Sequence, residues 1–78
     1  MNENINTLTT ILALVKNARR ELYYIENDFI ENEATEKQEE TISNAIDLTY
    51  DLETECERLV KLIEEQEDYI KKVCGSVQ

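Results

Sequence analysis

Residues 36–74 read EKQEETISNAIDLTYDLETECERLVKLIEEQEDYIKKVC and decide the fold of this chain. The stretch contains neither glycine nor proline, so nothing in it interrupts a helix. Mostly apolar residues recur in it at alternating steps of three and four: Ile42, Ala45, Thr49, Leu52, Cys56, Leu59, Ile63, Gln66, Ile70 and Val73. This spacing predicts one long amphipathic helix that packs lengthwise on another helix, with Leu52 and Cys56 buried in the contact.

The preceding residues show the same pattern. Steps of three and four connect Leu8, Ile11, Val15, Ala18, Leu22, Ile25 and Phe29. They predict a first helix over about residues 4–31, with Asn2 or Asn4 as its N-cap. We call the two apolar rows together the predicted seam.

The residues between the rows predict a short loop, 32–35. Asn32 is expected to adopt the left-handed conformation that ends many helices. Thr35 and Gln38 have the spacing of a capping box, which predicts that the second helix begins at about residue 36. It is expected to end at about residue 74, just before Gly75.

A short loop between two long helices predicts an all-α fold, an antiparallel two-helix hairpin that forms a single domain over residues 1–78. Folding the chain about the loop places Val15 opposite Leu52 and Ala18 opposite Thr49. An alternative breaks the second helix between residues 47 and 53 and folds its end back as a third helix.

Apolar residues outside the predicted seam indicate self-association. One flank of the seam holds Ile5, Leu12, Ile46 and Val60, extended by Tyr23, Ile30 and Tyr50. The other flank, with the end of the second helix, supplies the predicted oligomer interface: Leu14, Leu48, Leu62, Tyr69, Ile70 and Val73. We therefore expect two hairpins to pair into a four-helix-bundle homodimer.

The composition gives little support for catalysis. The chain has no histidine, one glycine and two cysteines, so it lacks the commonest general base, a glycine-rich phosphate loop and a cysteine metal cluster. We expect no enzymatic activity, no cofactor and no metal. No apolar run approaches the roughly 20 residues of a membrane span, and no signal-peptide pattern opens the chain, so we expect a cytoplasmic protein without membrane contact.

The net charge of −10 predicts repulsion from nucleic acids and attraction to basic protein surfaces. Acidic residues expected on the outer side of the second helix form an acidic stripe: Asp47, Asp51, Glu64, Glu65 and Asp68. Acids one helical turn apart are about 6 Å from each other, which is similar to the charge spacing of a phosphate backbone. The stripe is therefore a candidate nucleic-acid mimic, and solubility is the alternative reason for it.

Arginines and tyrosines form a second candidate binding cluster. Both residue types are enriched at the energetic centres of protein interfaces. The candidates are Arg20, Tyr23, Tyr24 and Tyr50. For Arg19 the alternative is a structural pairing with Glu53 across the hairpin.

The function predicted from these features is a non-enzymatic, acidic helical protein that binds and inhibits a protein with a basic, nucleic-acid-binding surface. In its small size, acidity and lack of catalytic residues the chain resembles, in general terms, phage and mobile-element proteins that block host enzymes. Two alternatives remain open: a structural adaptor that acts through its apolar flanks, and a small protein that sequesters nucleotide ligands.

Overall fold

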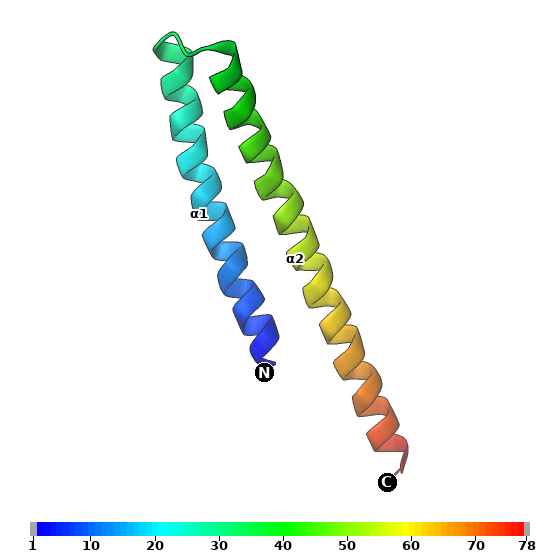
Figure 1. Ribbon diagram of the computed structural model, residues 1–78. Coiled ribbons are helices and arrows are strands. Elements are labelled where there is room, and N and C mark those ends of the chain that lie inside the picture. Colours follow the sequence, from blue (N-terminus) through cyan, green and yellow to red (C-terminus); the bar gives the residue numbers. More distant parts are fainter. Residues whose placement is uncertain (1, 78) are drawn as a thin grey trace.

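The computed structural model describes residues 2–77, and the side chains of residues 2–73, as two long antiparallel helices (Figure 1). Helix α1 covers Glu3–Glu31, helix α2 covers Glu36–Val77, and the two helices contact each other. Every element in this part of the chain is helical, which confirms the predicted all-α hairpin. The hairpin is long and thin, with extents of 68 × 17 × 11 Å.

Local hydrogen bonds determine where α1 begins and ends. The Oδ1 atom of Asn2 accepts bonds from two backbone N–H groups of the first turn, at 2.8 and 3.4 Å, so Asn2 is the N-cap. At the other end, the side-chain amide of Asn32 donates to the Asp28 carbonyl oxygen at 3.1 Å. The left-handed conformation predicted for Asn32 lies instead at Glu33, where φ is 40°. That prediction was wrong because Asn32 also donates its backbone N–H to Asp28 and turns the chain one residue later.

The predicted capping box opens α2. The Thr35 N–H donates to Oε1 of Gln38 at 2.9 Å, and the Gln38 N–H donates to Oγ1 of Thr35 at 3.1 Å. Helix α2 then runs without a break through residues 47–53, so the alternative with a third helix is wrong. The helix also continues through Gly75 to Val77, because glycine permits a left-handed end without requiring one.

The helices meet along edges that are rotated from the predicted seam: Ile46 is buried, whereas Ala18 and Leu52 are exposed. The Nε atom of Arg19 lies 2.9 Å from the hydroxyl oxygen of Thr49, the position where the predicted seam had placed Ala18. The buried side chains are Leu8, Val15, Ile42, Ile46 and Cys56. Cys56 is buried as predicted, whereas Ile46 had been assigned to a flank.

The prediction that Leu52 is buried in the hairpin was wrong, since its side chain is 49% exposed. Helix α2 is rotated so that Ile46, rather than the smaller Ala45, is the more deeply buried of the two. On α1, the long Arg19 side chain takes the place predicted for Ala18. Ile46 and the aliphatic stem of Arg19 thus bury apolar area at the helix contact, while Leu52 and Leu59 stay exposed on the other edge of α2.

Helix α2 extends past the start of α1 (Figure 1). The Asn2 side-chain amide donates to a Glu67 carboxylate oxygen at 2.5 Å, which places the beginning of α1 beside Glu67. The last turns of α2 whose side chains are described carry exposed Tyr69, Ile70 and Val73, and we call this extension the overhang.

Candidate protein-interaction surfaces

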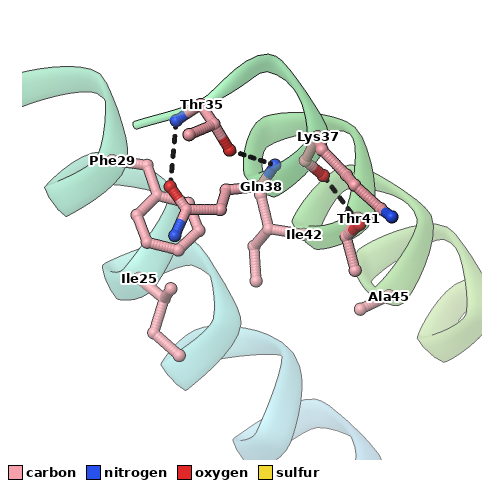
Figure 2. Close-up of a pocket in the computed structure, with 8 residues that line it drawn as sticks. All are labelled: Ile25, Phe29, Thr35, Lys37, Gln38, Thr41, Ile42 and Ala45. Atoms are coloured by element: carbon pink, nitrogen blue, oxygen red, sulfur yellow. Dashed lines mark hydrogen bonds between the residues drawn. The ribbon is translucent and has the colours of Figure 1, made fainter. Parts of the chain in front are cut away.

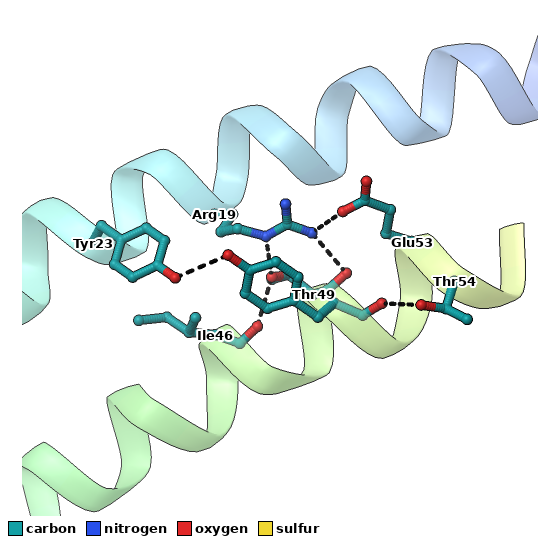
Figure 3. A network of polar contacts seen from close by, with 7 residues as sticks. Arg19, Tyr23, Ile46, Thr49, Glu53 and Thr54 are labelled. Carbon is teal, nitrogen blue, oxygen red and sulfur yellow. Dashed lines mark hydrogen bonds and ion pairs between the residues drawn. The ribbon is translucent and has the colours of Figure 1, made fainter. Parts of the chain in front are cut away.

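The hairpin presents two different faces on either side of the line where its helices meet. The first, which we call the network face, carries Arg19, Tyr23, Thr49, Tyr50 and Glu53 (Figure 3). The second, which we call the open apolar face, carries large exposed side chains from both helices: Leu14, Ile25, Leu48, Leu52, Leu59 and Leu62. The hairpin therefore offers a partner one polar and one apolar surface.

Arg19 is the centre of the network face. Its guanidinium group donates to the hydroxyl of Thr49 at 2.9 Å, to the Thr49 carbonyl oxygen at 3.2 Å, and to the Glu53 carboxylate. The Thr49 hydroxyl in turn donates to the Ile46 carbonyl oxygen at 2.6 Å. The Arg19 and Glu53 side chains are only 12% and 18% exposed. This confirms the structural pairing of Arg19 with Glu53 across the helix contact.

Tyr50 and Tyr23, the latter labelled in Figure 3, extend the network. The Arg19 guanidinium carbon lies 3.8 Å from the centroid of the Tyr50 ring, a cation–π contact. The Tyr50 and Tyr23 hydroxyl oxygens are 3.0 Å apart. This hydrogen bond, with partial burial, raises the pKa of Tyr23 above its ordinary value of 10.0. Two of the four predicted binding residues thus take part in contacts between α1 and α2.

The structure does not bring the other two predicted residues of that cluster, Arg20 and Tyr24, into this network. Arg20 is exposed, and its Nε atom lies 3.9 Å from a carboxylate oxygen of the adjacent Glu21. Tyr24 is also exposed. The four predicted residues of the cluster are thus divided between the Arg19 network and the exposed surface of α1.

The acidic stripe lies along the outer side of α2. All five of its members are exposed: Asp47, Asp51, Glu64, Glu65 and Asp68. Within the described part of the chain, the ion pairs involve other carboxylates, those of Glu21, Glu53 and Glu55. The stripe extends over about 32 Å of helix. Its carboxylates are thus spread along one edge, available to a basic surface, and not gathered at one point.

The open apolar face contains three of the six residues of the predicted oligomer interface. Leu14, Leu48 and Leu62 are exposed as expected, and Leu14 is 60% exposed. The rotation of α2 adds Leu52 and Leu59, which the predicted seam had assigned to the hairpin interior. The result is a row of leucines that runs along α2 and continues toward the exposed Tyr69, Ile70 and Val73 of the overhang.

A hollow of about 360 Å³ lies at the loop end of this face (Figure 2). Both helices and the loop contribute to its lining: Ile25, Phe29, Thr35, Lys37, Gln38, Thr41, Ile42 and Ala45. We call it the loop-end hollow. Its walls are largely apolar, and the Thr35 and Gln38 side chains at its rim are engaged in the capping box.

Sequence reasoning missed the loop-end hollow and the exposure of Leu52. The sequence did contain a signal for the exposure of Leu52. The flank with Ile46 and Val60 is as apolar as the predicted seam, and it lies beside Glu53, the expected partner of Arg19. The ion pair between Arg19 and Glu53 forms when this flank of α2 faces α1. The hollow had no comparable signal, since its walls come from both helices and the loop and depend on how these pack together.

Among the described residues, no helix is long and apolar enough to cross a membrane. The same residues contain no group of three or more histidine, cysteine, aspartate or glutamate side chains placed to hold a metal ion. No protein-family model, curated protein or solved structure matches this chain.

Proposed function

We propose that this protein is a non-catalytic interaction protein. Two hairpins pair through their open apolar faces into a four-helix bundle, and the bundle presents the acidic stripes of its α2 helices to a basic surface of another protein, which it blocks. The observation that carries the proposal is the open apolar face, a row of large exposed side chains that lies on both helices.

Water disfavours an apolar surface of this kind. Single exposed leucines are common, but contiguous apolar patches on soluble domains usually mark contact sites. A hairpin of 78 residues also has little core of its own, since no described side chain is fully buried. Pairing two hairpins supplies the missing core for both, and short-loop hairpins are the usual building blocks of four-helix bundles.

The acidic stripe supports a basic partner. The chain carries a net charge of −10, and the exposed carboxylates of the stripe are not neutralised by ion pairs among the described residues. Such a surface accelerates encounter with a positively charged surface and repels nucleic acid. A bundle that covers a basic nucleic-acid-binding surface prevents nucleic acid from reaching it.

Sedimentation equilibrium tests the pairing of hairpins. We expect a species of twice the 9.1 kDa chain mass at micromolar protein concentration. A monomer at every concentration up to the millimolar range contradicts the proposal.

Charge reversal tests the basic partner. Proteins captured from the native cell by the parent and by a variant with Asp47, Glu64, Glu65 and Asp68 changed to lysine are compared, after both are shown to have the same oligomeric state. The basic partner should be lost with the variant, and its association rate with the parent should fall steeply as salt rises.

The adaptor function is the second candidate, and the exposed leucines favour it equally. In that case the open apolar face receives an apolar helix of a different protein, and binding changes little with salt because exposed charges contribute little to it. Loss of binding on changing Leu52 or Leu62, together with indifference to charge reversal, would select the adaptor.

A further inference from the structure

We propose that the second copy docks with its α2 antiparallel to α2 of the first, on a twofold axis at Glu55, so that Tyr69 of each copy occupies the loop-end hollow of the other. This inference rests on the proposed homodimer and specifies its geometry. Three observations lead to it: the symmetry of the apolar row on α2, the unequal lengths of the helices, and the chemistry of the hollow.

The apolar row on α2 is self-complementary about Glu55. Leu48 and Leu62 lie equally far before and after Glu55, and Leu52 and Leu59 lie closer to it on either side. All four are exposed on the open apolar face. In a twofold dimer of antiparallel helices, a residue before the axis faces one equally far after it in the other copy. Leu48 of one copy then faces Leu62 of the other, and Leu52 comes within one residue of Leu59.

The helix lengths favour the same arrangement. Helix α2 has 42 residues and α1 has 29. If both loops lay at the same end of the bundle and α2 packed on the shorter α1 of the second copy, both overhangs would stay exposed. Antiparallel pairing of α2 with α2 covers each overhang with the loop end of the other hairpin. Tyr69, which is 68% exposed in the single hairpin, then loses its contact with water.

The symmetry places Tyr69 at the loop-end hollow. Tyr69 lies as far after Glu55 as Thr41, a residue of the hollow, lies before it. The hollow of about 360 Å³ offers apolar walls from Ile25 and Phe29, while Thr41 contributes a hydroxyl group (Figure 2). A tyrosine matches this surface because it combines a large apolar ring with a hydroxyl group that needs a polar partner.

The charges near the axis are compatible with this docking. Two Glu55 carboxylates approach each other there, and each is accompanied by Arg58, whose Nη1 atom lies 3.0 Å from a Glu55 carboxylate oxygen. Asp51 and Arg58 lie on opposite sides of Glu55, so that Asp51 of one copy comes within one residue of Arg58 of the other. The arrangement thus brings two pairs of opposite charges together at the edge of the leucine layers.

A cysteine placed on the axis tests the geometry. Glu55→Cys in a Cys74→Ser background should form a disulfide between copies on mild oxidation, because its symmetry mate reaches the roughly 5.5 Å between Cα atoms that a disulfide needs. Thr54→Cys in the same background is the matched control, since residue 54 lies on the outer side of α2. We expect Glu55→Cys to become a covalent dimer at least tenfold faster than Thr54→Cys, with the 55–55 bond identified by peptide mapping.

The possible failures are distinguishable. A sedimentation dimer in which Glu55→Cys cross-links no faster than Thr54→Cys overturns the docking geometry and leaves the homodimer standing. A sedimentation monomer overturns both.

Alanine substitution tests the hollow. Tyr69→Ala should raise the dimer dissociation constant at least tenfold, whereas Tyr24→Ala, which removes an equally large exposed tyrosine from the outer side of α1, should leave it within about twofold. Equal dissociation constants for the two variants would show that Tyr69 does not enter the hollow.

Discussion

At the scale of single residues, Arg19 decides how the two helices meet. Its guanidinium group contacts the Thr49 hydroxyl, the Glu53 carboxylate and the Tyr50 ring, all on the other helix. Because the Arg19 and Glu53 side chains are largely shielded from water, the charge of each is compensated mainly by the other. The position of Arg19 therefore fixes which edge of α2 faces α1.

Arg19→Met keeps the aliphatic stem and removes the charge. We expect the free energy of unfolding to fall by about 1–3 kcal/mol, because Glu53 loses its partner while still partly buried. Arg20→Met, at an exposed neighbouring position, is the control and should change it by no more than about 0.5 kcal/mol. Urea unfolding followed by circular dichroism measures both, and equal midpoints for the two variants would assign Arg19 no structural role.

Tyr23 provides a prediction about pH. Its pKa is raised in the folded protein, mainly by the hydrogen bond with Tyr50. The contact therefore contributes to stability below the ordinary tyrosine pKa of 10.0, and this contribution is lost as the pH rises through the higher folded pKa. An NMR titration of the Tyr23 ring should show a midpoint above 10.0 that moves down in Tyr50→Phe. An unchanged midpoint in Tyr50→Phe would mean that the hydrogen bond is not the cause.

At the scale of elements, the beginning of α2 is determined by local chemistry. Thr35 and Gln38 satisfy each other's backbone N–H groups, which a helix start otherwise leaves unpaired. This pair holds the chain where it leaves the loop, beside the hollow at the end of the open apolar face. A weaker cap should therefore loosen that end of the hairpin first.

Thr35→Ala removes one bond of the capping box. We expect the free energy of unfolding to fall by about 1 kcal/mol. Thr10→Ala is the control, because Thr10 lies within α1 and its hydroxyl donates only to the Asn6 carbonyl oxygen of the same helix, at 3.1 Å. Alanine favours a helix interior, so this change should not destabilise the protein. Thermal unfolding of both variants decides the matter, and a Thr35→Ala midpoint at or above that of Thr10→Ala would speak against the cap.

At the scale of the whole molecule, α2 has two apolar edges, one for the contact with α1 inside the hairpin and one for the contact in the proposed dimer. The edge of α2 with Ile46 and Cys56 is buried against α1, while the edge with Leu52 and Leu59 remains exposed. A helix with two apolar edges is typical of a bundle, in which each helix has two neighbours. Stability of such a protein depends on its concentration, because the dimer buries what the monomer exposes.

The variant Leu52→Asp tests pairing of the hairpins separately from folding of the single hairpin. Leu52 is half exposed in the hairpin, so an aspartate there should leave the helices intact at high protein concentration but prevent pairing. The melting temperature of the parent should rise over a hundredfold increase in concentration, and that of Leu52→Asp should not. Leu52→Met, which conserves apolar volume, should behave as the parent does. A parent melting temperature that is independent of concentration would refute pairing.

Self-repulsion is the corresponding electrostatic property of the whole chain. Neutralising Asp47, Glu64, Glu65 and Asp68 as amides reduces a net charge of −10 without touching a described ion pair. We expect the melting temperature at low salt to rise, and the difference from the parent to shrink at 0.5 M salt because salt screens the repulsion. A lower melting temperature at low salt would show that these carboxylates stabilise the fold.

The sequence by itself determined the helices of this protein. The apolar spacing, the Asn2 cap and the capping box of Thr35 and Gln38 are signals within one or two helical turns, and the structure contains all of them. The absence of glycine and proline across residues 36–74 likewise indicated the continuity of α2. Such features could be predicted because the interacting groups are neighbours along the chain.

Only the tertiary structure decided which apolar edge of each helix closes the hairpin. Both edges of α2 have helical spacing, and a rotation that exchanges Leu52 for Glu53 leaves the periodicity unchanged. The choice depends on contacts between residues far apart in the sequence, such as Arg19 with Thr49 and Glu53, and on the greater area buried by Ile46 than by Ala45. The same long-range packing creates the loop-end hollow and leaves the row of leucines exposed, because neither follows from the order of residues within one helix.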